Sequence, residues 1–388
     1  MSLGIYIQVP FCQTKCTYCN FHTGVVSSAR FAPYAKAVET EIREHRSRLS
    51  SAGVALPDSL AALTVDTVYF GGGTPSLLDP AHLQGMLDAV CETFPSKVRE
   101  VTLEADPETV VSKKAEAWAA AGINRVSFGV QSFSDAELKA AGRMHRRADI
   151  YLAVPILRAA GICNISFDLI AGLPQQSSDS WRNSLEELIE IAPQHVSIYV
   201  LEVDEGSRLG SELLRGGAKY FASAVPSDDV MADSYDSARH VLTAAGYEHY
   251  EISNFAKPGF ASEHNRKYWR REPYLGFGAG AHSFSSLQRW ANAHDSAAYV
   301  QSIAAGKVPI EQLETISSSQ ALEEELFLGL RQLAGVDLDR LQESYGVSLK
   351  DRFTSLESAG LIECSGSVVR LVPAHLSISN EVFVALMR

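Results

Sequence analysis

IYIQVPFCQTKCTYCNF, residues 5–21, is the stretch from which the fold of this chain is most readily predicted. Apolar and polar residues alternate over residues 5–9, a pattern typical of a β-strand. Cys12, Cys16 and Cys19 follow directly after that run. The stretch therefore predicts three thiols gathered on the loop that leaves a strand.

Downstream of this stretch, short β-branched runs alternate with longer amphipathic segments up to about residue 202. This alternation is typical of parallel strands joined by helical crossovers. Gly122, Gly161 and Gly246 each precede an apolar run, where a glycine ends a helix. The predicted strands cover residues 4–9, 66–70, 98–104, 124–130, 163–169 and 195–201. We expect an α/β fold, a partial (β/α)6 TIM-like barrel, over residues 1–202.

The rest of the chain divides into two further regions. Residues 203–300 are expected to extend the barrel. Residues 301–388 contain helices and then two apolar runs around Ser365-Gly366-Ser367, the pattern of a winged helix. This region carries 7 basic and 12 acidic residues, 7 − 12 = −5, which argues against DNA binding. We expect a C-terminal accessory domain with a packing or lid role.

Composition excludes several classes of protein. The 388 residues are 46% hydrophobic and 21% charged, as in ordinary globular proteins, and the formal net charge of −12 argues against binding nucleic acid. No apolar run reaches membrane-span length and no signal-peptide pattern is seen, so a cytoplasmic location is expected. Cys91, Cys163 and Cys364 stand singly among apolar neighbours, and we expect them to be small buried hydrophobes.

Polar and glycine-rich motifs end five of the predicted strands. Because the carboxyl ends of parallel strands share one rim, where barrel proteins assemble their chemistry, these motifs should meet at one site. Glycines lack a Cβ, so the second loop would let its backbone approach a ligand closely. The motifs are the cysteine loop, Gly71-Gly72-Gly73-Thr74-Pro75, Glu104-Ala105-Asp106-Pro107, Gln131, and Asp168 through Gly172-Leu173-Pro174.

The three clustered cysteines fit two kinds of metal centre. Three thiolates can hold three irons of a [4Fe-4S] cluster and leave the fourth iron open to a small molecule. The alternative is a structural zinc ion, with His22 completing a Cys3His set. Zinc sites normally pair two ligand knuckles far apart in sequence, and this chain has no second knuckle, which favours the cluster.

Together, the C-x3-C-x-Y-C motif and the GGGTP loop resemble the radical S-adenosylmethionine (SAM) superfamily. Within it the chain resembles the oxygen-independent coproporphyrinogen III oxidase group along nearly its whole length, including Glu325-Leu326-Phe327-Leu328-Gly329-Leu330-Arg331 of the accessory domain. This resemblance implies that Cys12, Cys16 and Cys19 hold the cluster and that SAM binds its open iron. The implied SAM-site residues are Tyr6, Tyr18, Gly72, Gly73, Thr74, Glu104, Gln131, Arg143 and Asp168.

Each polar residue of that set also has a simpler interpretation. Glu104 could cap a helix, Arg143 could form a surface ion pair, and Asp168 could orient another ligand. The shared position at the rim favours the cofactor role.

Two departures from the oxidase pattern point to the HemW-type heme chaperones, a branch of the same group. Phe21 stands where the oxidases carry a further cysteine, and Tyr6 lies almost at the N-terminus, where the oxidases have a substrate-side arm. His264-Asn265-Arg266-Lys267-Tyr268-Trp269 matches the H-N-x-x-Y-W motif of that branch, whose histidine binds heme. The basic residues Arg266, Lys267, Arg270 and Arg271 would meet the propionates, and the alternative is a solvated basic helix face.

Three hypotheses follow from these motifs. The first is a heme chaperone that binds heme and a SAM-coordinated [4Fe-4S] cluster and passes heme to apoproteins. The second is a radical SAM enzyme acting on a porphyrin, as an oxygen-independent coproporphyrinogen III oxidase, an activity that we do not expect, or a heme methyltransferase. The third is a zinc-stabilised barrel that binds another protein. Heme and heme-accepting apoproteins are the expected partners, and peripheral contact with a membrane is left open.

Overall fold

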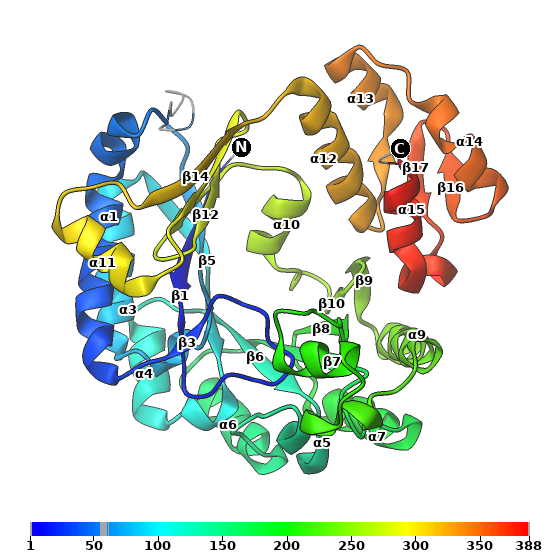
Figure 1. Cartoon of the computed structure of the whole chain (residues 1–388), viewed down its shortest axis with the longest axis horizontal. Coiled ribbons are helices and arrows are strands. Elements are labelled where there is room, and N and C mark those ends of the chain that lie inside the picture. The colour runs from blue at the N-terminus through cyan, green and yellow to red at the C-terminus, as the bar shows by residue number, and fades with distance from the viewer. Residues whose placement is uncertain (1, 55–59, 61, 387–388) are drawn as a thin grey trace.

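The structure of the protein is a computed structural model that describes residues 2–54, 60 and 62–386. Its centre is the predicted run of six parallel strands, which curve in the spatial order β1-β4-β5-β6-β7-β8 (Figure 1). These strands are β1 (Leu3–Val9), β4 (Val65–Gly72), β5 (Ser96–Ala105), β6 (Arg125–Gln131), β7 (Asn164–Ala171) and β8 (His195–Val200). The α/β fold expected from the alternating pattern is confirmed.

Helical crossovers join the parallel strands and cover the outer face of the sheet (Figure 1). Gly122, Gly161 and Gly246 follow α4 (Ser112–Ala120), α6 (Arg147–Ala159) and α9 (Asp228–Ala244) with positive φ angles of 94°, 91° and 85°, a conformation that glycine adopts without strain. The helices of this layer are α1 (Phe31–Ser51), α3 (Pro80–Thr93), α4 (Ser112–Ala120), α5 (Asp135–Ala140), α6 (Arg147–Ala159), α7 (Ser178–Ile191) and α9 (Asp228–Ala244).

Both edges of the parallel sheet are extended, so the large sheet has twelve strands among the described residues. At the β8 edge, β10 (Asn254–Ala256) and β9 (Glu248–Glu251) add antiparallel strands. At the other edge β11 (Tyr274–Phe277) pairs parallel with β1. The antiparallel strands β12 (His282–Phe284), β13 (Gln288–Asn292) and β14 (Ile310–Thr315) continue that edge. Residues 203–300 thus contribute to both edges of the sheet.

A short helix, α10 (Glu263–Trp269), lies on the concave side of the sheet and packs against β4 and α12 (Ser318–Arg331) (Figure 1). Its approach to β1 is close: a Cβ at Gly4 would lie 3.0 Å from Cδ of Lys267 and 3.3 Å from Cε1 of His264. Glycine at position 4 therefore makes room for the helix inside the curved sheet.

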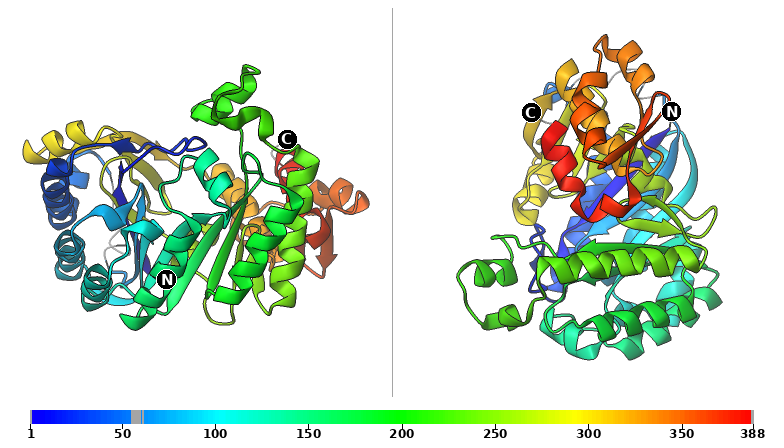
Figure 2. Two further views of the ribbon diagram at one scale, coloured as in Figure 1. Left: turned by 90° about the horizontal axis from the view of Figure 1, so that it is seen from below. Right: turned by 90° about the vertical axis from the view of Figure 1, so that its right-hand side faces the viewer.

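The C-terminal region, orange to red in Figure 2, lies beside the large sheet. It contains a three-stranded antiparallel sheet in the order β15-β17-β16, and Gly366 turns between the last two strands with φ 64°. Its elements are α12, β15 (Val336–Asp337), α13 (Leu338–Tyr345), α14 (Lys350–Ser358), β16 (Ile362–Ser365), β17 (Val368–Leu371) and α15 (Ser379–Leu386). The expected boundary at residue 301 runs through α11 (Ser296–Ala304), because β14 still pairs with β13 of the large sheet.

Two small features complete the rim of the sheet. The strands β2 (Phe11–Cys12) and β3 (Gly24–Val25) pair at the two ends of the cysteine loop. The helix α8 (Arg208–Leu214) and the 3-10 turn after it, in green, stand out from the sheet in Figure 2. Among the residues described, every helix is too short or too polar to cross a membrane.

Candidate functional site

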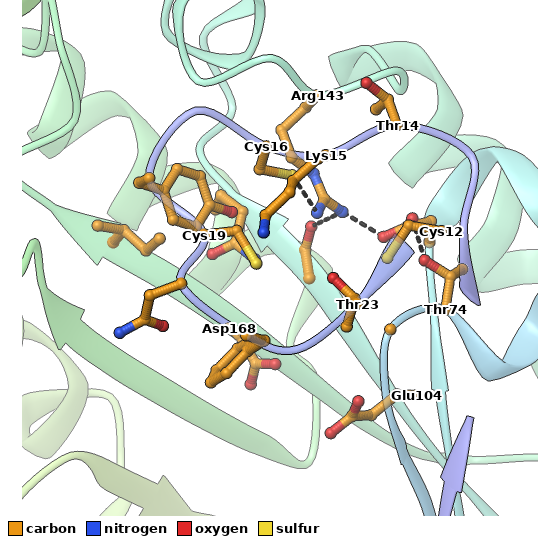
Figure 3. A pocket seen from close by; sticks show the side chains of 18 of the residues that line it. Cys12, Thr14, Lys15, Cys16, Cys19, Thr23, Thr74, Glu104, Arg143 and Asp168 are labelled. Carbon is orange, nitrogen blue, oxygen red and sulfur yellow. Dashed lines mark hydrogen bonds and ion pairs between the residues drawn. The ribbon is translucent and has the colours of Figure 1, made fainter. Parts of the chain in front are cut away.

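One cavity of about 430 Å³ opens at the carboxyl ends of the parallel strands (Figure 3). The carboxyl ends of β1, β4, β5, β6, β7 and β8, or the loops that follow them, all contribute to its wall, as the shared rim predicts. Eleven of the thirteen predicted site residues line it: Cys12, Cys16, Tyr18, Cys19, Gly72, Gly73, Thr74, Glu104, Gln131, Arg143 and Asp168. The two others, Tyr6 and His264, are not among its lining residues.

The cysteine loop presents its thiols to the cavity. Cys12, Cys16 and Cys19 are all free and half-buried. Burial raises the pKa of the Cys12 and Cys19 thiols, and hydroxyl groups of Thr23 and Thr74 hydrogen-bond Cys12 and oppose that rise. These three thiols line the same cavity, whereas the other three cysteines are not among its lining residues. Cys91, Cys163 and Cys364 are exposed rather than buried: Cys91 lies on α3, Cys364 on β16, and Cys163 in the loop directly before β7.

Arg143 joins three elements of the site. Its guanidinium forms an ion pair with Asp106 and donates to the carbonyl oxygen of Gly129 at 2.9 Å and to Sγ of Cys16 at 3.5 Å. The side chain is only 10% exposed, which excludes the surface ion pair considered as its simpler interpretation.

Two buried carboxyl groups lie at the ends of β5 and β7. Glu104 accepts hydrogen bonds from the Tyr69 hydroxyl and from the backbone N–H of Gly72, each at 2.9 Å. Burial raises the pKa of Glu104 to about 7 and that of Asp168 to about 6. Glu104 belongs to β5 and caps no helix. Both groups can therefore change charge near neutral pH in response to a ligand.

Gln131 has the geometry of a residue held for a ligand. Its φ angle is 64°, in the left-handed region that few residues other than glycine adopt. Its buried Oε1 atom has no hydrogen-bond partner in the protein. An unpaired buried amide oxygen is costly, and a bound polar molecule would satisfy it.

The glycine loop serves packing as well as ligand approach. A Cβ at Gly73 would lie 2.5 Å from the carbonyl oxygen of Phe11, and one at Gly72 would lie 2.4 Å from the Gln8 side chain. The backbone N–H of Thr74 donates to Phe11 at 2.7 Å. Because Gly72 and Gly73 have no side chains, this loop can pack directly against the start of the cysteine loop.

His264 lies in the interior of the protein, away from the cavity. It is 1% exposed, and both ring nitrogens are hydrogen-bonded, Nδ1 with the Thr67 hydroxyl at 2.9 Å and Nε2 with the Tyr268 hydroxyl at 2.8 Å. Burial lowers the pKa of His264 to about 3, so the imidazole is neutral. In this arrangement hydrogen bonds within the protein occupy both of its possible ligand atoms, and the expectation that this histidine binds heme stays a prediction.

The basic residues around His264 are also largely occupied. Lys267 is buried and forms ion pairs with Asp66 at 2.8 Å and Glu272 at 3.3 Å. Arg266 pairs with Glu263 and Arg271 with Glu324. Arg270 alone of the four is exposed. The sequence suggests an anion site here, whereas three of its four charges neutralise carboxylates of the protein itself.

Tyr6 is the other predicted residue outside the cavity. Its hydroxyl donates to Oε1 of Gln8 at 2.6 Å, and its ring stacks 6.0 Å from that of Tyr69. It therefore supports the wall behind Glu104 through Tyr69.

Two acidic lining residues were given no role of their own in the sequence analysis. Asp106 holds Arg143 and accepts a hydrogen bond from the Thr74 hydroxyl at 3.1 Å. Asp204 accepts from the Asn20 side chain at 2.8 Å and so ties the loop after β8 to the cysteine loop. Asp106 belongs to the predicted rim motif Glu104-Ala105-Asp106-Pro107, so the sequence placed it at the rim without showing that it holds Arg143. Asp204 lies in none of the predicted rim motifs, so no sequence pattern assigned it to the site.

The side chains that line the cavity fit an iron–sulfur cluster together with a small, positively charged ligand. Three soft thiols are the side chains that iron–sulfur clusters use. Five carboxyl residues, Glu104, Asp106, Asp168, Glu202 and Asp204, line the cavity with two cations, Lys15 and Arg143. In the described ranges, no three His, Cys, Asp or Glu side chains gather at the geometry of a single metal ion. His22, the fourth ligand of the zinc alternative, is not among the lining residues.

Comparison with known proteins agrees with this site. Residues 6–188 match the family model of the radical SAM superfamily, and residues 316–374 match that of the HemN C-terminal domain. The fold is similar to that of the coproporphyrinogen III oxidase HemN of Escherichia coli, with a TM-score of 0.83 and 20% identity over 99% of this chain and 90% of that one.

Among curated proteins, the heme chaperone HemW of Bacillus subtilis is 34% identical over 98% of both chains. The heme chaperone HemW of Escherichia coli is 35% identical over 72% of this chain and 69% of its own. The mouse mitochondrial radical S-adenosyl methionine domain-containing protein 1 is 33% identical over 88% of this chain and 75% of its own. The cysteine loop, the rim cavity and this full-length similarity together show that the chain belongs to the HemW family of the radical SAM superfamily.

Proposed function

We propose that this protein is a heme chaperone, which binds heme, carries a [4Fe-4S] cluster with SAM, and passes heme to apoproteins. The observation that carries this proposal is the 34% identity to a heme chaperone over 98% of both chains. We place the activity in the cytoplasm, where the six free cysteines would remain reduced.

The cavity residues support the cofactor part of the proposal. Cys12, Cys16 and Cys19 would ligate the cluster, which when bound supplies an iron with an open position for SAM. Glu104 and Asp168 would accept hydrogen bonds from SAM and balance its positive sulfonium, and Gln131 would use its unpaired Oε1. Arg143 fixes the wall by holding Asp106 and Cys16 together.

Iron analysis tests the cofactor part. Anaerobic reconstitution with iron and sulfide should give about four irons per chain and a broad visible absorption. Cys12→Ala, Cys16→Ala and Cys19→Ala should each abolish that absorption, whereas Cys91→Ala, an exposed cysteine outside the cavity, should leave it unchanged. Stoichiometric zinc in protein never exposed to air would contradict the proposal.

Hemin titration and transfer test the chaperone part. The reconstituted protein should bind hemin with a Soret band and release it to apomyoglobin, used as a model acceptor. A protein that binds no hemin would contradict the proposal. Formation of protoporphyrinogen from coproporphyrinogen III at many turnovers, in an anaerobic assay with SAM and a reductant, would instead assign the chain to the enzymes of its superfamily.

A further inference from the structure

Gln131, which lines the cavity, is the centre of a strained turn at the end of β6. Its φ angle is 64°, and the backbone N–H of Ser132 donates across it to the carbonyl oxygen of Val130 at 2.8 Å. This pattern is a γ-turn, and the positive φ makes it the rare and strained form of that turn. A residue other than glycine keeps such a conformation only where its surroundings hold it.

Hydrogen bonds hold the turn from both sides. The carbonyl oxygen of Val130 also accepts from Nε2 of His145 at 3.1 Å. On the other side, the Ser132 hydroxyl donates to Oε2 of Glu137 at 2.7 Å. Ser132 and Glu137 are both buried, with 0% and 1% of their surfaces exposed. The side chain of Glu137 thus holds the residue that directly follows Gln131.

Glu137 also joins this turn to the neighbouring strand β7. The same Oε2 atom accepts from Nε2 of Gln176 at 3.1 Å. Nε2 of Gln176 donates as well to the carbonyl oxygen of Ile170 at 3.0 Å, two residues after Asp168 on β7. One carboxyl group therefore links the two strand ends that present Gln131 and Asp168 to the cavity.

Packing alone does not explain an acidic residue at position 137. In the described part of the chain Glu137 forms no ion pair, and its buried Oε1 atom has no hydrogen-bond partner. A buried carboxyl group without a cation is unfavourable, although its place in the first turn of α5 offsets part of that cost. An apolar side chain of similar size would fill the same space without that cost. The hydrogen bonds that Glu137 gives to the turn explain its presence better than packing does.

The turn also sets the position of the Gln131 amide. A Cβ at Gly129 would lie 2.9 Å from Nε2 of Gln131 and 3.1 Å from a guanidinium nitrogen of Arg143, so glycine at position 129 makes room for both side chains. Oε1 of Gln131 is buried and has no partner within the protein. Because the rotamers of a side chain depend on its backbone angles, a turn that relaxed would move this oxygen. Holding the turn therefore holds the oxygen that is left for a ligand.

We propose that Glu137 is a positioning residue for SAM binding, which holds the strained turn at Gln131 through Ser132 and ties it to β7 through Gln176. Glu137 is not among the residues that line the cavity, so its effect on SAM passes through Gln131. Oε1 of Gln131 would accept a hydrogen bond from a hydroxyl or amino group of SAM. This inference rests on the proposed function, which places SAM in the cavity.

Calorimetric titration of the cluster-loaded full chain with SAM tests this role. Glu137→Ala and Ser132→Ala should each weaken SAM affinity about five- to tenfold, the effect of one hydrogen bond. Glu137→Gln should stay within about threefold of wild type, because its amide oxygen can accept the same hydrogen bonds. Glu251→Ala is the matched control, since Glu251 is a buried carboxyl residue on β9 outside the cavity. It should lose stability and still bind SAM as tightly as wild type does.

A double-mutant cycle separates positioning from a general loss of stability. If Glu137 acts through Gln131, the double variant Gln131→Ala, Glu137→Ala should bind SAM no more weakly than Gln131→Ala alone. Two losses of affinity that multiply in the double variant would overturn the proposal. Far-UV circular dichroism shows whether each variant is folded. Ser132→Ala, which removes a single hydroxyl group, replaces Glu137→Ala in the cycle if the latter does not fold.

The outcomes separate this role from the proposed function. If wild type binds SAM and both Glu137→Ala and Ser132→Ala keep its affinity within about twofold, Glu137 has no positioning role and the proposed function stands. An equal loss in Glu251→Ala would also overturn the role. If cluster-loaded wild type binds no SAM, this inference and the SAM part of the proposed function both fail. A loss in both variants that disappears in the Gln131→Ala background, with Glu251→Ala unchanged, would establish the role.

Discussion

The rim cavity and the α10 region use similar residue types in opposite ways. At the rim, Gln131 keeps a buried oxygen unpaired in a left-handed conformation, and Glu104 keeps a pKa near 7. Around α10, His264 uses both ring nitrogens and Lys267 pairs with two carboxylates. A ligand site is therefore marked by polar atoms whose hydrogen-bonding capacity is unmet, rather than by the presence of polar residues alone.

Removing the buried charge of α10 should produce the largest effect on stability. Lys267→Met leaves Asp66 and Glu272 without their shared cation in the interior. Breaking such a buried pair costs about 3 kcal/mol or more of unfolding free energy, measured by urea denaturation. Arg266→Ala, one residue earlier on the same helix, breaks a partly exposed pair with Glu263 and should cost about 1 kcal/mol or less. Equal losses in the two variants would contradict the buried role of Lys267.

Replacing His264 should lower stability, and the variant also tests whether its imidazole contributes to heme binding. His264→Ala leaves the hydroxyls of Thr67 and Tyr268 unpaired and opens a cavity beneath α10. We expect a loss of about 2–3 kcal/mol in unfolding free energy. Hemin affinity, measured below the melting temperature, separates the two roles, because it stays within twofold of wild type if the imidazole only supports α10. A fully folded variant with strongly reduced hemin affinity would show that α10 opens and that His264 meets the iron.

The carboxyl groups of the rim should make SAM binding depend on pH. Glu104 and Asp168 have pKa values of about 7 and 6 and are ionised only above them. The affinity of cluster-loaded protein for SAM, measured by calorimetry, should therefore fall about tenfold as pH decreases from 8 to 5.5. Glu104→Gln should remove the step near pH 7. An affinity that is constant over this range would exclude these carboxylates from the SAM site.

The raised pKa of Glu104 should also make the free energy of unfolding depend on pH, which is a smaller effect. The pKa of Glu104 in the folded protein lies above its ordinary value of 4.5, so the folded state binds the proton more tightly. The ligand-free protein should lose about 1–2 kcal/mol of unfolding free energy as pH rises from about 4.5 through 7. Glu104→Gln should flatten part of that decline in urea titrations at several pH values.

Much of the rim was predictable because it is encoded locally. Each parallel strand ends in its own motif, and the fold class alone brings strand ends to one edge. Cys12, Glu104 and Asp168 needed no further information to be assigned to a common site. Asp204 was missed, because its contact with Asn20 joins segments that no local pattern relates.

By itself the sequence determined the parallel strands, the cysteine loop and the rim motifs, since hydrophobic periodicity and turn residues act over a few positions. Only the tertiary structure decided which polar side chains satisfy one another. It turned the motif at 264–269 inward, where Thr67 and Tyr268 occupy His264, and it brought His22 to His294 at the surface. Hydrogen-bond satisfaction depends on contacts between distant segments, so a local pattern cannot show whether a histidine is occupied or free.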